Sequence, residues 1–499
     1  MSDDETEMDI LATLSRGASL HVVGKIFFNV FGFLLHLVLS RGLGAGLYGI
    51  YAYGKTLSRI AIVFTNLGSD QSVLKYLPEY SDDAAQQRLF FGLSVLTSLV
   101  GSIVAAAVLA VYAPVISNLT IDRPEFIGVL RLFAIITVFD TLARIIHSSF
   151  RGLERLEYEV LSSKISRPIL RLIGVVGALS LGYSLTGVMV ALVVASGLVL
   201  GIASYLLLSR FELRPWISSD QVTRSSVFEY YNFSIPLTMK NAADILIRRV
   251  DIFMVGLFFS STVVGYYNIS LLIAGFLTIP LMGFNQLFPP IASRLYMNGE
   301  IPKLNSLYNT VTRWVFTISF LMAIGAFVYR AEILSLFGED FTAGTPVLAL
   351  FVVGQLFNCL GGPNGYLLMM TERQYVLVVN QWVFGIVNVV LNYVMITTFG
   401  VLGAAVATAG VFAMLNIVQT IELWYFERLF PYSLNFLKPL FAGVITTIVM
   451  VSIRYVMSDT VLLIIGGLTG VVTYGIVLLA IGIEEDDKEF FGKVTDGVK

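Results

Sequence analysis

The stretch NAADILIRRVDIFMVGLFF, residues 241–259, lies in a run that is otherwise apolar enough to cross a lipid bilayer. It nevertheless carries four charged residues, Asp244, Arg248, Arg249 and Asp251. Charged side chains inside a membrane are costly, so they are expected to face protein or water rather than lipid. The function of this helix therefore depends on where these charges point.

The composition of the whole chain is that of a polytopic membrane protein. Of its 499 residues, 56% are hydrophobic and only 13% are charged, and the mean hydropathy is +0.81. These values lie far outside the usual range of soluble domains. The net charge of −2 gives no general attraction to nucleic acid, and membrane lipids are the expected surroundings.

Metal, redox and cofactor chemistry have little support in the sequence. The single cysteine, Cys359, cannot form an internal disulfide, and the three histidines, His21, His36 and His147, lack metal-ligand spacing. We therefore expect no cofactor. The apolar run that follows Arg16 is too long for a signal peptide, so the first helix is expected to remain in the protein.

Apolar runs of about 20 residues predict an all-α integral membrane protein with 14 transmembrane helices. The predicted spans are 18–40, 50–69, 89–112, 125–147, 160–182, 184–208, 232–258, 262–290, 307–329, 346–369, 374–397, 401–424, 434–456 and 460–482. Basic residues gather in alternate connections, which places both termini in the cytoplasm. A multi-pass protein of the cell (plasma) membrane follows.

An internal repeat with an offset of about 216 residues pairs YGIY (48–51) with VGYY (264–267) and LTGVMVA (185–191) with VLGAAVA (401–407). Each unit holds six spans, which predicts two lobes related as parallel repeats, with a substrate site at their interface. The predicted parts are an acidic cytoplasmic tail (1–17), an N-lobe (18–208), a cytoplasmic linker (209–231), a C-lobe (232–424), two further helices (434–482) and a cytoplasmic tail (483–499).

Polar residues recur on one side of several predicted helices. At 100° per residue, Lys240, Asn241, Asp244, Arg248 and Asp251 share a face of the seventh helix. The first helix repeats this pattern with His21, Lys25, Asn29 and His36. The second adds Tyr51, Lys55, Arg59, Asn66 and Asp70 on one side. Lys164, Arg167 and Arg171 align on the fifth.

Two interpretations of these charges remain open. Asp244, Arg248 and Asp251 have the spacing of structural ion pairs within a helix. Across the spans, however, basic residues outnumber acids, which favours a water-filled cationic cavity whose ligand is an anion such as phosphate or pyrophosphate. The predicted binding residues are Lys25, Lys55, Arg59, Lys240 and Arg248, supported by His21, Asn29, His36, Tyr51, Asp244 and Asp251; Lys164, Arg167, Arg171 and Arg249 are further candidates.

The two adjacent arginines are expected to differ. Arg248 is predicted to extend into the cavity between Asp244 and Asp251, whereas Arg249 lies almost opposite and is predicted to be structural. On the fourth helix, Asp140, Arg144, His147 and Arg151 share a side, and a structural network there is favoured over a proton relay.

One motif suggests a nucleotide site that the context contradicts. GIYAYGKT (49–56) satisfies the phosphate-loop pattern, but it lies inside a predicted membrane helix, without the preceding strand and flexible loop that phosphate binding needs. We therefore interpret Lys55 as a cavity residue rather than as a nucleotide ligand.

The chain resembles the polysaccharide and oligosaccharide-lipid flippases (Wzx-like) of the multidrug, oligosaccharidyl-lipid and polysaccharide exporter superfamily. The resemblance is carried by LSRGLGAGLYGIYAYGKTLSRIAIVFTNLGSDQSVLKYLPEY (39–80), FRGLERLEYEV (150–160), and FPPIASRLYMNGEIPKLNSLYN with YRAEILSLFGEDFTAGTPVLALF (within 288–351). It implies a non-enzymatic transporter that turns a polyprenyl-linked saccharide to the outer leaflet by alternating access.

The resemblance also implies cavity cations on the first, second and seventh or eighth helices, to which Lys25, Lys55, Arg59, Lys240 and Arg248 are similar; the eighth helix here has none. A coupling ion, H⁺ or Na⁺, and a monomer are expected. Alternatives are a multidrug or cation antiporter of the same superfamily, which would want acids in its cavity, and a membrane glycosyltransferase or polymerase, which would want a large outer loop.

Overall fold

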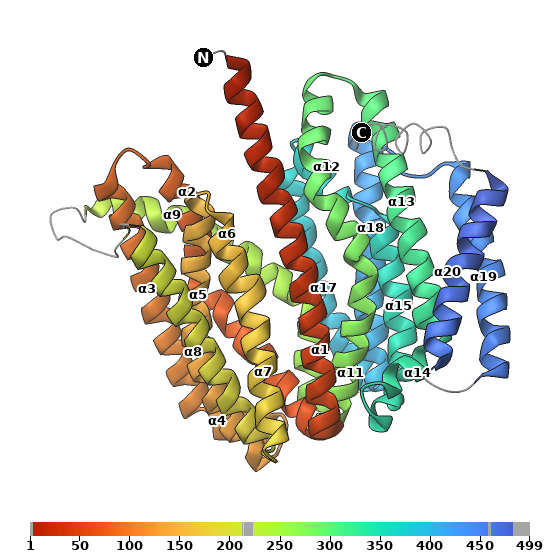
Figure 1. Cartoon of the computed structure of the whole chain (residues 1–499), viewed down its shortest axis with the longest axis horizontal. Helices are drawn as coiled ribbons and strands as arrows, with labels where there is room; N and C mark the ends of the chain where they lie inside the picture. Colours follow the sequence, from red (N-terminus) through yellow and green to blue (C-terminus); the bar gives the residue numbers. More distant parts are fainter. Residues whose placement is uncertain (1–2, 212, 214–222, 458–460, 483–499) are drawn as a thin grey trace. The chain divides into compact units, whose positions relative to one another are not determined.

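The computed structural model describes residues 3–211, 213, 223–457 and 461–482, and the side chains from residue 23 onward. Over these residues the protein is helical, without strands, and 11 helices are long and apolar enough to cross a membrane. The chain forms two compact units, Met1–Gly265 and Tyr266–Lys499, which are described separately (Figure 1). The side chain of His21, part of the linker (212 and 214–222) and the C-terminal tail lie outside the described residues.

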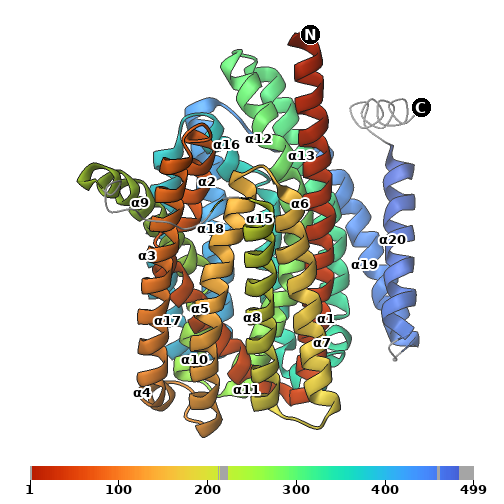
Figure 2. The ribbon, with the colours of Figure 1, turned by 60° about the vertical axis from the view of Figure 1, so that its left-hand side comes forward.

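Unit 1 is built around α5, which packs against α3 and α8 and also contacts α1 and α2 (Figure 2). Its elements are α1 (Asp3–Asn66), α2 (Ser69–Glu79), α3 (Ala84–Val111), α4 (Ala113–Leu119), α5 (Pro124–Gly152), α6 (Leu156–Glu159), the π-helix η1 (Val160–Ser166), α7 (Arg167–Ser180), α8 (Leu185–Arg210), α9 (Arg224–Arg248), α10 (Val250–Phe258) and the start of α11 (Ser261–Gly275).

The regular α-helical backbone of unit 1 is interrupted at three places within or between the predicted spans. Gly44, in the middle of α1, has φ 71° and ψ 170°, a conformation that glycine adopts readily, and it separates the first two predicted spans. The fifth span starts as a π-helix, a form often found at functional sites. The seventh span breaks at Arg249, whose φ of −140° and ψ of −13° are not helical.

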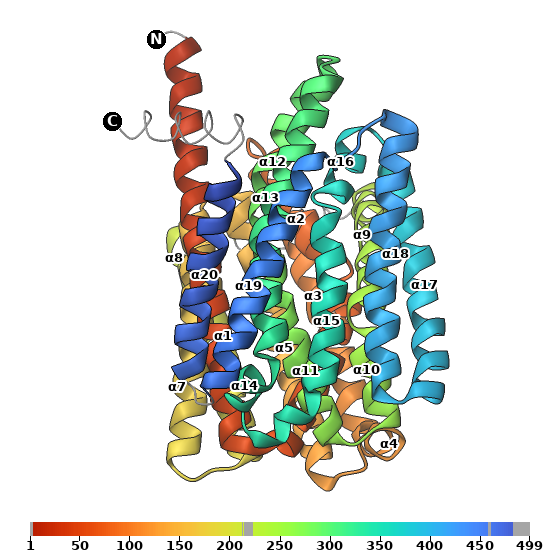
Figure 3. The same ribbon diagram turned by 90° about the vertical axis from the view of Figure 1, so that its right-hand side faces the viewer.

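Unit 2 contains two pairs of long adjacent helices, α17 with α18 and α19 with α20 (Figure 3). Its elements are the rest of α11, η2 (Phe276–Thr278), α12 (Ile279–Met297), α13 (Ile301–Val328), α14 (Arg330–Ser335), η3 (Glu339–Gly344), α15 (Thr345–Leu360), α16 (Asn364–Met370), α17 (Gln374–Phe399), α18 (Val401–Glu427), η4 (Leu434–Phe436), α19 (Leu437–Val456) and α20 (Val461–Ile481).

The two compact units and the predicted repeat divide the chain differently. The contacts place α9 and α10 in unit 1, with the boundary inside α11, whereas the repeat divides the chain at the linker 209–231. Contacts group helices that pack together, while a repeat groups helices of common origin, so the repeat stays a prediction. The helix α9 begins at Arg224, inside the predicted linker.

The glycine that opens the phosphate-loop pattern has a packing role. A Cβ atom at Gly49 would overlap the backbone carbonyl of Ser261, and one at Gly265 would overlap that of Ala45. The two backbones, in α1 and at the start of α11, can approach this closely because both positions lack a side chain. Gly49 therefore lies in a helix, not in a phosphate-binding loop, and it allows α1 to pack closely against α11.

We predict that Gly49→Ala destabilises the protein by about 1 to 3 kcal/mol, because the added methyl group must push two backbones apart. The measurement is the thermal unfolding midpoint of the purified protein in detergent. Gly32→Ala is the matched control on the same helix, since a Cβ there meets nothing within 4 Å and alanine favours helix. An equal midpoint for the two variants would contradict the packing role of Gly49.

Candidate functional site

Unit 1 encloses a cavity of about 560 Å³, and its walls come from α1, α2, α5, α6, η1, α7, α8 and α9. Nine basic side chains line it: Lys55, Arg59, Arg144, Arg151, Lys164, Arg167, Arg171, Arg248 and Arg249. Four acidic side chains line it as well: Asp70, Asp140, Glu159 and Asp244. The lining therefore has a formal excess of five positive charges.

Each of the four acids holds one of the basic residues. Arg171 donates to both oxygens of Asp140, with Nη2 2.8 Å from Oδ2, and Arg248 Nε lies 2.7 Å from Asp244 Oδ1. The remaining ion pairs are Arg144 with Asp70 at 3.0 Å and Lys164 with Glu159 at 3.5 Å. These pairs fix four cations to the walls and reduce the charge that they can offer to a ligand.

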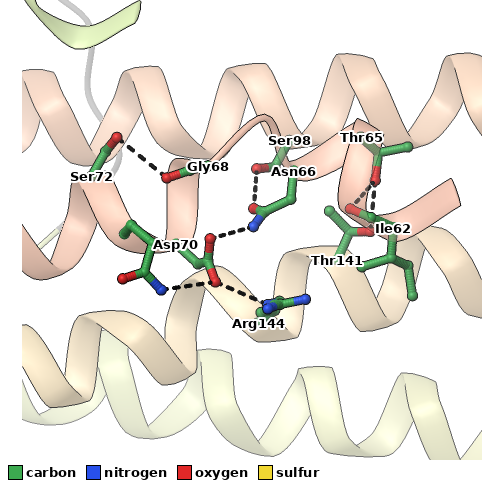
Figure 4. Close-up of polar contacts among 10 residues, drawn as sticks. Ile62, Thr65, Asn66, Gly68, Asp70, Ser72, Ser98, Thr141 and Arg144 are labelled. Carbon is green, nitrogen blue, oxygen red and sulfur yellow. Dashed lines mark hydrogen bonds and ion pairs between the residues drawn. The ribbon is translucent and has the colours of Figure 1, made fainter. Parts of the chain in front are cut away.

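The Asp70 pair forms part of a larger polar network at the break between α1 and α2 (Figure 4). The carboxylate of Asp70, which is 4% exposed, accepts from Arg144 Nε on α5 and from Asn66 Nδ2 at 2.5 Å. Asn66 in turn accepts from Ser98 on α3. Because this network joins four helices, α1, α2, α3 and α5, it anchors one end of the cavity wall.

The five other basic residues of the lining make no ion pair with any residue that the structure describes: Lys55, Arg59, Arg151, Arg167 and Arg249. The Nε of Arg167 is buried and has no hydrogen-bond partner among the described atoms. Unpaired cations in a partly enclosed space are expected to bind anions. They are the strongest candidates for ligand contact.

Lys55 is held in place by a buried histidine. Its Nζ lies 3.2 Å from His36 Nε2, and His36 Nδ1 lies 2.7 Å from the hydroxyl of Tyr48. The two ring nitrogens of His36 join the side chains of Lys55 and Tyr48. His36 thus lies behind the cavity wall and orients Lys55 toward the cavity.

The structure brings most of the predicted site residues together. Tyr51, Lys55, Arg59, Asp244 and Arg248 line the cavity, as do Lys164, Arg167, Arg171 and Arg249. No group of three or more metal-ligating side chains occurs among the described residues.

Lys25, Asn29 and Lys240 do not line the cavity of unit 1, and their role in binding stays a prediction. Lys25 is half-buried and precedes the lining residue Phe28 by one turn, while Lys240 is exposed and precedes Asp244 by one turn. Helical periodicity predicts which residues share a face of a helix, but it does not predict how far along the helix a cavity extends.

The seventh span differs from its predicted geometry, which assumed that Arg249 faces away from Arg248. Arg249 lines the cavity beside Arg248, and Asp251 is fully buried, with its carboxylate accepting from the backbone N–H of Ile252. The prediction placed Arg249 opposite Arg248 because it assumed one continuous helix. The break at Arg249 changes the direction of every side chain that follows Arg248.

The cavity also contains residues that the sequence interpretation assigned elsewhere or missed. Asp140, Arg144, His147 and Arg151 all line it, so the face predicted on the fourth helix belongs to the site as well as to the ion-pair network. Their spacing of three and four residues was the available signal. Asp70 lies on the face predicted for the second helix together with Lys55 and Arg59. Glu159 gave no comparable signal, since its partner Lys164 lies in the π-helix.

The sequence matches two protein-family models and a probable flippase. The sequence model of the family described as polysaccharide biosynthesis protein matches residues 14–295, and that of MatE matches residues 236–394. The chain is 25% identical over 502 residues to the probable flippase AglR of Haloferax volcanii, covering 94% of this chain and 96% of that protein.

Two solved structures show the same fold. The lipid II flippase MurJ in an inward closed conformation superposes with a TM-score of 0.68 at 13% identity, covering 91% of this chain and 97% of that one. An inward-facing multidrug resistance MATE transporter of the MOP superfamily gives a TM-score of 0.66 at 13% identity, covering 80% and 94%. Since the first family match spans more than half of the sequence, this chain belongs to the family described as polysaccharide biosynthesis protein.

Proposed function

We propose that the protein flips a polyprenyl-(pyro)phosphate-linked oligosaccharide from the cytoplasmic to the outer leaflet, for the assembly of a surface polysaccharide or glycan. The observation that carries this proposal is the excess of five positive charges in the cavity of unit 1. A phosphate or pyrophosphate group is the part of such a substrate that cations recognise. The names of the relatives AglR, a probable flippase, and MurJ, a lipid II flippase, agree with it.

The unpaired cations have the leading role in this proposal. Lys55, Arg59, Arg167 and Arg249 bind the phosphate oxygens, and Arg151 adds charge at a further position of the lining. The paired residues Arg144, Lys164, Arg171 and Arg248 hold the walls in place through their acids. No chemical bond of the substrate changes, so the protein acts as a transporter and not as an enzyme.

Fourteen membrane spans are proposed, three more than the 11 helices that qualify by length and composition. One additional span arises because the candidate Val23–Asn66 contains two spans, separated at Gly44. The other two additional spans are the one divided between η1 and α7 and the one divided between α9 and α10. Each of these is too interrupted to qualify as one long helix.

The topology and the transport cycle belong to the same proposal. Both termini are cytoplasmic, the protein resides in the plasma membrane, and two six-helix lobes with two additional helices alternate access as a monomer. H⁺ or Na⁺ is proposed as a coupling ion.

A second candidate function is a multidrug or cation antiporter, which the MatE match over 236–394 favours. An organic cation would be attracted by acids, whereas the cavity of unit 1 is lined by nine basic and four acidic side chains. The charge of this cavity therefore favours an anionic substrate. A membrane glycosyltransferase or polymerase has no observation in its favour.

The deciding experiment removes the protein from its cells and identifies the lipid-linked saccharide that accumulates. We expect an intermediate that stays in the cytoplasmic leaflet, together with loss of the surface glycan. If drug resistance changed while every lipid-linked intermediate stayed at its normal level, the antiporter would be the better assignment.

We predict that an inside-negative membrane potential speeds export, because the headgroup carries its negative charge outward. The contribution is about 2.3 kcal/mol per charge per 100 mV. It is measured as flipping of the lipid-linked saccharide in proteoliposomes with an imposed potassium diffusion potential. Transport that is indifferent to the sign of this potential, with ion gradients absent, would exclude this driving force.

A further inference from the structure

Unit 2 contains a carboxylate within a membrane helix that no cation neutralises. Glu422 lies on α18, in the candidate span Val401–Glu427, and makes no ion pair with any described residue. Its Oε2 accepts from Asn380 Nδ2 on α17, at 2.6 Å. An ionisable side chain on a membrane helix is a candidate for function.

The same carboxylate lines a pocket of about 520 Å³ between α17 and α18. Apart from Asn380 and Glu422, the walls are apolar or aromatic: Tyr375, Val376, Val379, Ile421, Tyr425 and Phe426. The rings of Tyr425 and Phe426 lie edge to face, with centroids 5.1 Å apart. A single negative charge among aromatic rings is the chemistry that binds an ammonium group, through the charge and through cation–π contacts.

Arg373, which immediately precedes α17, already forms an ion pair. Arg373 Nε lies 2.9 Å from Glu427 Oε1, and the Arg373 guanidinium lies 4.8 Å from the centre of the Phe426 ring. Arg373 is not part of the pocket lining. Among the residues that the structure describes, none of the pocket lining is a cation.

The position of the pocket favours a lipid. It lies in the first turns of α17 and the last turns of α18, at the depth where helix ends meet lipid headgroups, and its rim residues Tyr375 and Tyr425 are 79% and 67% exposed. Exposed apolar side chains continue from it along both helices: Val383, Ile386, Ile417 and Met414. A headgroup at Glu422 would place an acyl or prenyl chain along this surface.

We propose that the pocket between α17 and α18 binds a membrane lipid whose headgroup carries an ammonium group. The ammonium contacts the Glu422 carboxylate and the ring of Tyr425, and the chain of the lipid lies against the exposed apolar residues. This site is distinct from the cationic cavity of unit 1, and it does not depend on which substrate that cavity transports.

The test uses the full-length protein in detergent, with native mass spectrometry to count bound lipids during titration. Phosphatidylethanolamine and phosphatidylglycerol with the same chains are compared, because they differ in the ammonium group. We expect phosphatidylethanolamine to bind about tenfold more tightly, and Glu422→Gln to remove this preference. Glu427→Gln is the matched control, an acid on the same helix that pairs with Arg373 outside the pocket, and its preference should stay.

A measurement on the unmodified protein keeps the test independent of how the variants fold. Dodecyltrimethylammonium, which has a chain and an ammonium group but no phosphate, should displace phosphatidylethanolamine, whereas dodecyl sulfate should not. Equal binding of the two phospholipids, displacement by both detergents, or an unchanged preference in a folded Glu422→Gln protein would each overturn the proposal.

Discussion

Arg249→Gln is expected to lower the rate of flipping about 10- to 100-fold while leaving the protein abundant and inserted. Arg249 lines the cavity of unit 1 and makes no ion pair with the described residues, so its guanidinium remains available to a phosphate group. A hydrogen bond from a charged donor contributes about 1.5 to 3 kcal/mol, which corresponds to this loss. The measurement is flipping in proteoliposomes, normalised to the amount of protein.

Arg248→Gln is the matched control, since the two residues are adjacent and both line the cavity. Asp244 already neutralises Arg248, and both side chains of that pair are more than half exposed, so we expect less than about a fivefold loss of flipping. If Arg248→Gln abolished flipping and Arg249→Gln mainly reduced abundance, the continuous-helix interpretation of this span would be correct after all.

Asp140→Asn is expected to cause the largest loss of stability, about 3 kcal/mol or more. Asp140 and Arg171 are 18% and 20% exposed, and removing the carboxylate leaves the Arg171 charge without its partner inside the bundle. Because whole proteins are stable by only about 5 to 15 kcal/mol, the amount of folded protein in the membrane should fall. Thermal unfolding in detergent and quantitative immunoblotting of membranes measure the two effects.

Two comparisons separate a lost ion pair from other effects of this substitution. The double variant Asp140→Asn/Arg171→Gln should recover part of the stability, because no unpaired charge remains. Asp244→Asn should cost less than about 1 kcal/mol, since its pair with Arg248 is exposed. A double variant that is no more stable than Asp140→Asn would show that the pair itself does not account for the loss.

The residues of α1 show how much of the site the sequence could predict. Lys55 and Arg59 are four residues apart within a regular helical segment, so their common face followed from periodicity, and the structure places both in the lining. The same reasoning adds Lys25 and Lys240, which do not line this cavity. Periodicity predicts direction around a helix axis, but the ends of a cavity depend on neighbouring helices.

The ion pairs could not be predicted by the same means. Asp70 and Arg144 are 74 residues apart, and Asp140 and Arg171 are 31 apart. Their spacing within a single helix carries no information about which carboxylate meets which guanidinium. The excess of basic residues in the spans was visible in the sequence, whereas their division into four paired and five unpaired side chains required the packed helices.

By itself the sequence determined that this is a helical membrane protein with basic residues in excess inside its spans, because long apolar runs and the count of charges do not depend on packing. The tertiary structure decided which cations remain available to a ligand. Arg249 illustrates the physical reason: a break of one residue between α9 and α10 turns its side chain into the cavity, and Asp251 beyond it is buried. Such a break, and the distant partners of the other charges, are set by contacts between helices that no local pattern encodes.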